Sequence, residues 1–219
     1  MNKQVIVIAS ALGLVLAFII GAMAYRGNAV EETAAKAFEN ADVMIRADSH
    51  TLGPDSARVV IVEFLDPGCE TCAMFYAPVK EIMAANPDKI KLVIRYAPFH
   101  QGSDTMVKML MAATRQDQYW PVLEMMFATQ GEWASHHHPQ PEKVWEFLPQ
   151  TSVDVERLRA DMALPEADAF VQQEIADCET LGVKKTPTFF VNGKPLPTFG
   201  LQPLVELVDA ELALNYPTP

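Results

Sequence analysis

The sequence predicts an α/β domain in which a parallel sheet unit is interrupted by a helical segment and completed afterwards. Residues 58–65 and 90–96 are apolar, β-branched runs, and residues 73–85 between them are compatible with a helix. A strand, helix and strand of this length imply a parallel, right-handed crossover. Helical spacing then dominates residues 103–182, and strand-type sequence returns over residues 183–199.

The first strand, residues 58–65, is almost continuously hydrophobic, which indicates burial on both faces of the sheet. The following helix contains Pro78, whose ring removes a backbone hydrogen bond and predicts a kink. Asn86-Pro87-Asp88 ends that helix. The second strand, residues 90–96, is also hydrophobic, so we expect both strands in the centre of the sheet.

The helical segment is expected to contain five helices. Ser103-Asp104 can cap the first, and Gly182 stops the last. We place them at residues 105–115, 119–129, 141–148, 153–163 and 165–181.

The second half of the sheet follows this segment. Thr188-Phe189-Phe190-Val191 favours a strand, and Asn192-Gly193 is a strong signal for a two-residue hairpin turn. A proline-broken edge strand is expected over residues 194–199, and an amphipathic closing helix over residues 203–214.

The N-terminal segment indicates export. Residues 5–24 form an uncharged apolar stretch that is long enough to span a bilayer and longer than the core of a typical cleavable signal. Ala22-Met23-Ala24 also fits a signal-peptidase site, so an inner-membrane anchor and a signal peptide cleaved near Ala24 both remain open. Either would place the remainder in the periplasm or at the extracytoplasmic face.

The boundaries predict four parts. Residues 1–26 are the anchor or signal peptide, and residues 27–50 are a spacer, which we expect to be a solvated stalk or an oligomerising helix. Val30, Ala34, Ala37, Ala41 and Met44 recur at helical spacing within it. The α/β domain comprises residues 51–102 and 183–215, and residues 103–182 form an all-helical insertion.

Composition narrows the function. The formal net charge of −11 argues against nucleic acid as a partner and against docking on anionic lipid. Three cysteines are too few for a disulfide-rich scaffold. We therefore expect a soluble exported domain that is attached to the membrane only through its N-terminal segment.

Cys69-Glu70-Thr71-Cys72 lies between the first strand and the first helix. Two thiols at this spacing indicate a redox-active pair, because N–H groups and the dipole at a helix N-terminus favour a thiolate. Half of a zinc site is the alternative, but the chain has no second Cys-x-x-Cys.

Four features in this order resemble the thioredoxin fold and its DsbA-like branch. The cysteine pair opens the first helix, Glu63 lies six residues before Cys69, Thr186-Pro187 heads a later strand, and a helical insertion separates the two halves. The resemblance covers residues 52–214, about three-quarters of the chain.

The resemblance implies a protein thiol:disulfide oxidoreductase that needs no cofactor. Cys69 would be the exposed nucleophile, and Cys72 would resolve the mixed disulfide. Glu63 would be a buried acid that exchanges a proton with Cys72. Pro187, after Thr186, would be cis, and substrate peptide would pair beside it. The implied partners are unfolded or cysteine-containing exported proteins and a membrane redox partner that resets the pair.

The residues between the cysteines depart from the relatives. Glu70-Thr71 matches neither the Pro-His of strong oxidases nor the Gly-Pro of thioredoxin, and a glutamate there predicts a higher Cys69 pKa and a weaker oxidant. The threonine before Pro187, Thr186, is similar to the residue at this position in disulfide isomerases and copper-sensitivity suppressor proteins more than to that in oxidases. Oxidase, isomerase and reductase therefore all remain open.

Three further features carry weaker expectations. Cys178 is expected to be a buried free thiol, and His100 could approach the pair and stabilise a thiolate. His136-His137-His138 could bind copper or zinc, although a polar loop is the simpler interpretation. A non-catalytic metal-binding or chaperone module of the envelope is therefore the alternative function.

Overall fold

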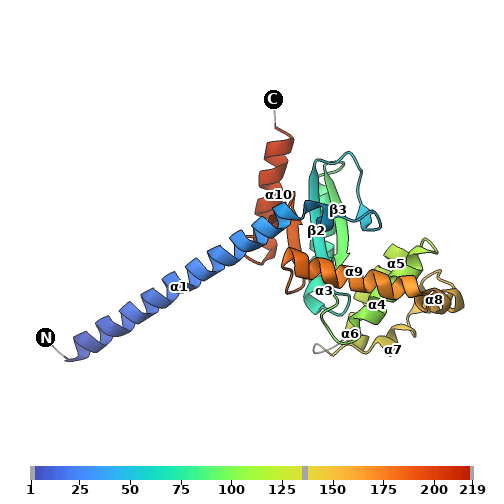
Figure 1. Ribbon diagram of the computed structural model, residues 1–219, viewed down its shortest axis with the longest axis horizontal. Helices are drawn as coiled ribbons and strands as arrows, with labels where there is room; N and C mark the ends of the chain where they lie inside the picture. The colour runs from blue at the N-terminus through green and yellow to red at the C-terminus, as the bar shows by residue number, and fades with distance from the viewer. Residues whose placement is uncertain (1–2, 135–137, 218–219) are drawn as a thin grey trace.

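The computed structural model describes residues 3–134 and 138–217. Helices surround one mixed sheet, and a long N-terminal helix projects from this body (Figure 1). The elements are α1 (Lys3–Glu39), α2 (Ala41–Met44), β1 (His50–Leu52), β2 (Val59–Leu65), α3 (Glu70–Ala85), β3 (Ile90–Tyr96), α4 (Ser103–Thr114), α5 (Tyr119–Ala128), α6 (Gln130–Trp133), α7 (Pro141–Val144), the 3₁₀ helix η2 (Leu148–Gln150), α8 (Val155–Met162), α9 (Pro165–Leu181), β4 (Thr188–Val191), β5 (Lys194–Pro195) and α10 (Leu201–Asn215).

The sheet has the strand order β1-β3-β2-β4-β5. The two predicted central strands, β2 and β3, pair in parallel, and β4 pairs antiparallel with β2 on its other side. Asn192 and Gly193 both have positive φ, 48° and 79°, and connect β4 to β5 as the hairpin signal predicts. The edge strand is shorter than expected and comprises only Lys194–Pro195. The short edge strand β1 was not predicted.

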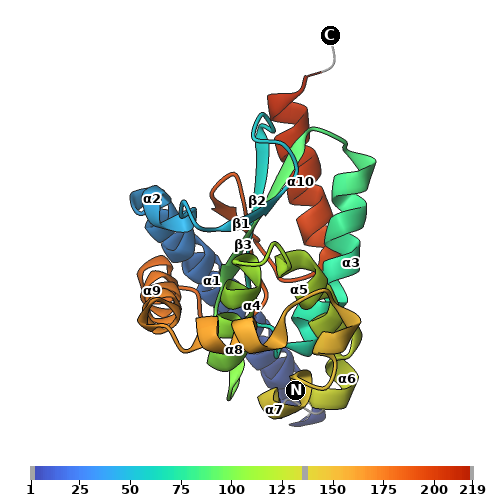
Figure 2. The same cartoon turned by 90° about the vertical axis from the view of Figure 1, so that its right-hand side faces the viewer.

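Each face of the sheet carries its own layer. Figure 2 shows α3 beside α10 on one face, and α9 with the end of α1 on the other. Side chains alternate along β2: Ile61 and Leu65 contribute to the core under α3, whereas Val62 and Phe64 pack toward α9. Because helices cover both faces, the two central strands are almost wholly buried, as their sequence predicted.

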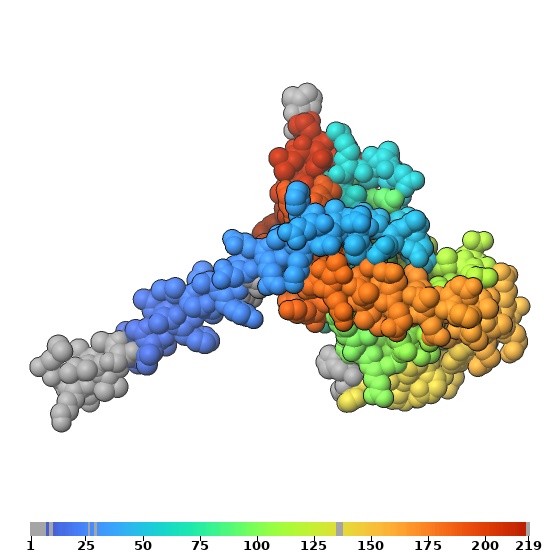
Figure 3. All heavy atoms as spheres, in the orientation of Figure 1, coloured from blue at the N-terminus to red at the C-terminus, as the bar shows by residue number. Residues whose placement is uncertain are grey.

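The expectation of a solvated stalk at residues 27–50 was wrong for its later part. α1 continues through this segment to Glu39, and Ala37 and Met44 are buried in the core cluster that contains Phe64 and Leu181. The space-filling view shows the end of α1 and α2 lying along α9 (Figure 3). The alanine-rich side of α1 packs here because small side chains let a helix approach the domain closely.

The projecting part of α1 exposes apolar side chains, including Leu14 and Phe18. Within the described residues, α1 is long and apolar enough to cross a membrane over Ala11–Glu39. A signal sequence would satisfy the same criterion.

The helical insertion differs in detail from its prediction. The third expected helix, at residues 141–148, is only α7 followed by η2, and α6 was not predicted. Ser103 does not cap α4, because its hydroxyl donates a hydrogen bond to Asp66 instead. Pro78 lies inside α3, which continues to Ala85.

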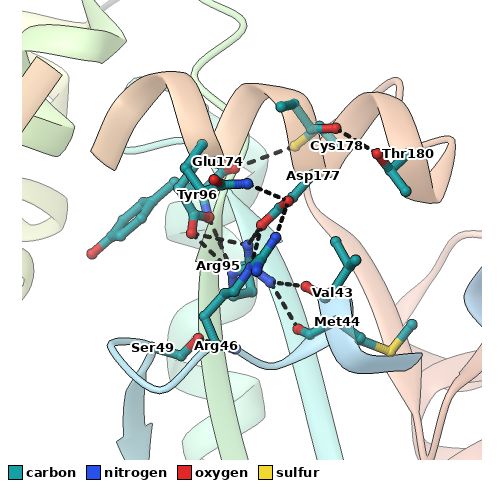
Figure 4. Close-up of polar contacts among 12 residues, drawn as sticks. Val43, Met44, Arg46, Ser49, Arg95, Tyr96, Glu174, Asp177, Cys178 and Thr180 are labelled. Carbon is teal, nitrogen blue, oxygen red and sulfur yellow. Dashed lines mark hydrogen bonds and ion pairs between the residues drawn. The ribbon is translucent and has the colours of Figure 1, made fainter. Parts of the chain in front are cut away.

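A buried ion cluster holds the N-terminal segment, the sheet and the insertion together (Figure 4). Arg95 of β3 donates to Glu174 of α9 at 3.0 Å, to Asp177 at 2.5 Å and to the Met44 carbonyl at 3.0 Å. Arg46 donates to Asp177 at 2.6 and 2.8 Å. Because one guanidinium contacts α2, β3 and α9, these elements are fixed relative to one another.

Candidate functional site

Cys69 and Cys72 lie at the carboxyl end of β2, where α3 begins. Cys69 occupies the N-cap position of α3 in an extended conformation, and Cys72 lies in the first turn. Both are free thiols. Cys72 is fully buried and Cys69 is 6% exposed, so Cys69 is less exposed than the sequence led us to expect.

The loop before β4 and the insertion both cover this position. The Cys69 Sγ lies 3.5 Å from the carbonyl oxygen of Thr186, and the Cys69 carbonyl accepts a hydrogen bond from Gln130 of α6. These contacts explain the low exposure of Cys69.

The two thiols have opposite acidities. The pKa of Cys69 falls to about 5, chiefly because the Cys72 thiol donates a hydrogen bond to it, with smaller effects from Thr186 and from the backbone N–H groups of Thr71 and Cys72. Burial and the hydrogen bond to Cys69 raise the pKa of Cys72 well above its ordinary value. Near neutral pH the structure therefore favours one thiolate, at Cys69, beside one thiol.

Glu70 was expected to raise the pKa of Cys69. In the structure the Cys69 pKa is lowered instead. The hydrogen bonds from Cys72 and from the first turn of α3 therefore outweigh any effect of Glu70. Whether the protein is a weaker oxidant than its relatives stays a prediction.

Glu63 lies beneath the pair on β2. Its side chain is 2% exposed and lies on the same face of the sheet as Ile61 and Leu65, under α3. Burial, followed by the charge of Cys69, raises the Glu63 pKa to about 8. Glu63 in turn raises the pKa of Cys72. A carboxyl group that titrates near neutral pH next to a buried thiol can exchange a proton with it.

Thr186 and Pro187 face the pair from the other half of the domain. The Thr186–Pro187 peptide bond is cis, as the resemblance implied. The loop continues directly into β4, which pairs with β2 next to Glu63. The structure thus brings together all five predicted site residues, Glu63, Cys69, Cys72, Thr186 and Pro187.

A carboxylate that the sequence reasoning missed organises the loop before Cys69. Asp66 is fully buried and accepts hydrogen bonds from the backbone N–H groups of Gly68, Phe99 and His100, at 2.8, 2.8 and 2.9 Å. It also accepts from the Ser103 hydroxyl. The Asp66 N–H group donates to the Cys72 Sγ at 3.4 Å. A polar residue at the carboxyl end of a central strand was the available signal for this role.

His100 is connected to the pair through Asp66. Its Nδ1 lies 2.8 Å from the Asp66 Oδ2, and this hydrogen bond is the main reason that the His100 pKa is raised. The negative charges of Cys69 and Glu70 raise it further. His100 thus contacts Asp66, whose N–H group donates to Cys72, and its stabilisation of a Cys69 thiolate stays a prediction.

The insertion holds the cysteine loop in place. The Gln130 amide donates to the carbonyl groups of Pro67 and Cys69, at 2.9 and 3.1 Å. A Cβ atom at Gly68 would lie 2.9 Å from both Pro139 and the Ser103 hydroxyl, so a larger residue would require these side chains to shift. Sequence patterns gave no signal for Gln130.

The remaining candidates are Cys178 and the three histidines. Cys178 is buried on α9, and its thiol donates to the Tyr96 carbonyl at 3.3 Å, as expected of a free structural thiol. His136 and His137 lie outside the described residues, and His138 is exposed. Within residues 3–134 and 138–217, no group of three or more His, Cys, Asp or Glu side chains is arranged to hold a metal ion.

Comparison with known proteins identifies the domain. The thioredoxin family profile matches residues 46–209. The Na⁺/H⁺ antiporter NhaA of Herminiimonas arsenicoxydans is 30% identical over 147 residues, which cover 67% of this chain and 23% of that protein. The chain thus spans about a quarter of the length of the curated relatives that it matches.

Solved structures agree with the profile. A thioredoxin-like oxidoreductase from Silicibacter pomeroyi is 26% identical, with a TM-score of 0.67 over 80% of this chain and 98% of that one. The thiol-disulfide exchange protein α-DsbA2 of Wolbachia pipientis shares the fold at 20% identity, with a TM-score of 0.65 over 83% of this chain and 96% of that one. With a cysteine pair at the start of α3, a cis-proline loop facing it and a helical insertion, the chain belongs to the thioredoxin family and shares its fold with DsbA-like proteins.

Proposed function

We propose that this protein catalyses thiol–disulfide exchange on exported proteins through Cys69 and Cys72. The observation that carries the proposal is the opposite acidity of the two thiols: the pKa of Cys69 is lowered to about 5, whereas that of Cys72 is raised. A pair of this kind supplies a nucleophilic thiolate at neutral pH and keeps its partner protonated until it is needed.

The reaction takes two exchanges. The Cys69 thiolate attacks one sulfur of a substrate disulfide, so a Cys69–substrate mixed disulfide forms as the substrate S–S bond breaks and the second substrate sulfur leaves as a thiolate. Cys72 then gives up its proton and attacks the Cys69 sulfur. The Cys69–Cys72 disulfide forms, and the substrate leaves reduced. Glu63, when ionised, accepts the Cys72 proton, and its pKa of about 8 suits it to return that proton in the reverse direction.

Run in reverse, the same two steps transfer a disulfide to a substrate dithiol. The direction depends on the reduction potential of the Cys69–Cys72 pair relative to its substrates and to the partner that resets it. Oxidase, isomerase and reductase activities remain alternatives that this potential separates. Titration of the pair in glutathione buffers, together with refolding of a scrambled disulfide protein, distinguishes them.

Location outside the cytoplasm follows from the N-terminal helix in this proposal. We assign residues 5–24 as a membrane anchor, because α1 passes through them and continues into the domain without a break. Mass spectrometry of the protein extracted from membranes tests this assignment. An intact N-terminal segment supports an anchor, whereas a mature chain beginning near Tyr25 shows a cleaved signal peptide.

Activity is tested with the full chain in mild detergent. Reduction of insulin by dithiothreitol should be accelerated by the protein and should lose this acceleration in Cys69→Ser. Cys178→Ala is the matched control, because it removes a thiol that lies outside the pair, and it should retain the activity. Failure of the unmodified protein to accelerate insulin reduction or to react with glutathione disulfide contradicts the proposed function.

A further inference from the structure

A groove of about 500 Å³ lies between the N-terminal helix and the chain around Pro187. α1 lines it between Tyr25 and Lys36. The opposite wall contains Pro187, Phe189, Leu196 and Phe199. We call this cavity the α1 groove. It is formed only because α1 packs against the β4–β5 edge of the sheet.

The α1 groove reaches the loop that faces the cysteine pair. Pro187 lines it and follows Thr186, whose carbonyl oxygen lies 3.5 Å from the Cys69 Sγ. Its aromatic wall also contacts the helix that carries the cysteines, because the Phe75 ring of α3 lies 5.4 Å from Phe189 and 5.2 Å from Phe199. A polypeptide that extends from the groove past Pro187 would therefore approach Cys69.

The groove has the opposite charge to the molecule as a whole. The chain carries a net charge of −11, yet the residues that line the groove include three lysines and one glutamate. The glutamate, Glu32, is paired with Lys36 at 2.8 Å. Lys184 and Lys185 are exposed beside it, and the Lys185 ammonium lies 5.9 Å from the Phe199 ring. Such a surface favours a segment that combines acidic and apolar side chains.

The position of the groove along α1 gives a second constraint. Tyr25 directly follows the apolar stretch of residues 5–24, where an aromatic residue is typical of the membrane interface. The groove extends from Tyr25 to Lys36, which is roughly 17 Å along a helix axis at 1.5 Å per residue. With residues 5–24 in a bilayer, the groove begins at the membrane surface and stays close to it.

We infer that the α1 groove binds an extended, acidic, cysteine-containing segment of a membrane protein, close to the point where that segment leaves the bilayer. This inference rests on the proposed exchange activity and on the anchored form of the chain. The lysines attract the acidic side chains, the aromatic wall packs against the apolar ones, and the tether confines the redox pair to the membrane surface.

The test uses the full chain with Cys72→Ser, which traps mixed disulfides at Cys69, reconstituted in nanodiscs of neutral phosphatidylcholine. The probes are single-span peptides in the same nanodiscs, each with a disulfide in its exported tail about 8 or about 40 residues from the bilayer. At each distance the flanking residues are acidic in one peptide and basic in another. Adduct formation is followed on non-reducing gels.

The near, acidic probe should form adduct about fivefold faster than the near, basic probe and faster than the distant, acidic one. Lys184→Glu with Lys185→Glu should abolish the preference for acidic tails. Lys89→Glu is the control, because Lys89 is exposed just before β3, at the opposite end of the strand from the site, and it should retain the preference.

Equal rates for acidic and basic probes, or a faster reaction at the distant position, overturn the inference. A preference that appears only when anionic lipid is added also overturns it, because the lysines would then be binding headgroups. Reaction with glutathione disulfide in the same nanodiscs distinguishes failure of the proposed partner from failure of the proposed exchange activity. If only the probes fail to react as expected, the partner is wrong. If glutathione disulfide also fails to react, the exchange activity itself is wrong.

Discussion

At the scale of single residues, the site works by placing similar groups in different environments. Cys69 and Cys72 are three positions apart, yet the pKa of one is lowered and that of the other is raised. Cys69 receives hydrogen bonds at the N-terminus of α3, whereas Cys72 lies one turn deeper, above the Glu63 carboxyl. In the proposed exchange, Cys69 would therefore be the attacking sulfur and Cys72 the resolving one.

Glu63→Gln should change how stability depends on pH. The Glu63 pKa is about 8 in the folded protein and 4.5 ordinarily, so the folded state keeps a proton that the unfolded state releases between these values. The contribution of Glu63 to the free energy of unfolding is therefore fully present below about pH 4.5. It falls as pH rises toward 8, by up to about 1.4 kcal/mol per pH unit. Cys69, whose pKa is lowered to about 5, gives an opposite trend in both proteins, so the comparison is the informative quantity. In urea denaturation of the reduced proteins, the free energy of unfolding of Glu63→Gln should gain on that of the unmodified protein as pH rises from 5 to 8. Parallel profiles for the two proteins would contradict the burial of a titrating carboxyl.

His100→Gln should make Cys69 less acidic. Glutamine can still donate to Asp66, but it removes the positive charge that interacts with the Cys69 thiolate. We expect the thiolate titration, followed by absorbance at 240 nm, to move to higher pH by about half a unit, or threefold in the equilibrium. Lys89→Gln removes an exposed charge at the far end of β3 and should leave the titration unchanged. An unchanged titration in His100→Gln would mean that His100 only stabilises the loop and does not affect the acidity of Cys69.

At the scale of elements, the insertion helps to build the site. Gln130 of α6 and Ser103 at the start of α4 donate hydrogen bonds to the loop between β2 and α3. The loop is thus stabilised by hydrogen bonds from two helices that lie more than 30 residues away in the sequence. This arrangement explains why a helical segment can interrupt the sheet and still serve the same active centre.

Gln130→Ala should destabilise the protein. The amide donates to two backbone carbonyls in a buried position, and its loss leaves both without that partner. We expect a decrease of about 1–3 kcal/mol in the free energy of unfolding, measured by urea denaturation. Gln202→Ala, which removes an exposed amide from α10, should change it by less than about 0.5 kcal/mol. Equal effects for both variants would mean that the hydrogen bonds from Gln130 do not stabilise the loop.

At the scale of the whole molecule, a charged cluster joins parts that are distant in the sequence. Arg95 lies within β3 and contacts α2 and α9, and Arg46 adds a second guanidinium to Asp177. Burial raises the pKa of Asp177, but the hydrogen bonds from Arg46, Arg95 and Gln173 outweigh it, and the net shift is downward. The cluster fixes α2, which directly follows α1, against β3 and α9.

Arg95→Met should therefore be strongly destabilising. It leaves Glu174 buried without its guanidinium and removes one of the two that pair with Asp177, which costs about 3–5 kcal/mol. Adding Glu174→Gln and Asp177→Asn should recover part of this loss, because fewer unpaired charges are then buried. Arg159→Met, at an exposed arginine over Trp145, is the control and should cost less than about 1 kcal/mol. No recovery in the triple variant would show that packing, rather than charge, explains the loss.

Much of the fold was predictable because its signals are local. Continuous apolar runs predicted β2 and β3, the Asn192-Gly193 pair predicted the hairpin, and Gly182 predicted the end of α9. The prediction of a continuous third helix in the insertion was wrong, because periodicity in a short segment did not distinguish such a helix from α7 followed by η2.

The candidate site residues were predictable, because a Cys-x-x-Cys at a strand-to-helix junction, an acid six residues earlier and a Thr-Pro before a hairpin are all readable in order along the chain. The acidities of these residues and the groups that surround them depend on tertiary contacts. The hydrogen bonds to Asp66, the Gln130 clamp and the packing of α1 beside Pro187 join residues that are far apart in the chain. No local pattern encodes such contacts, since they form only when separate elements pack together.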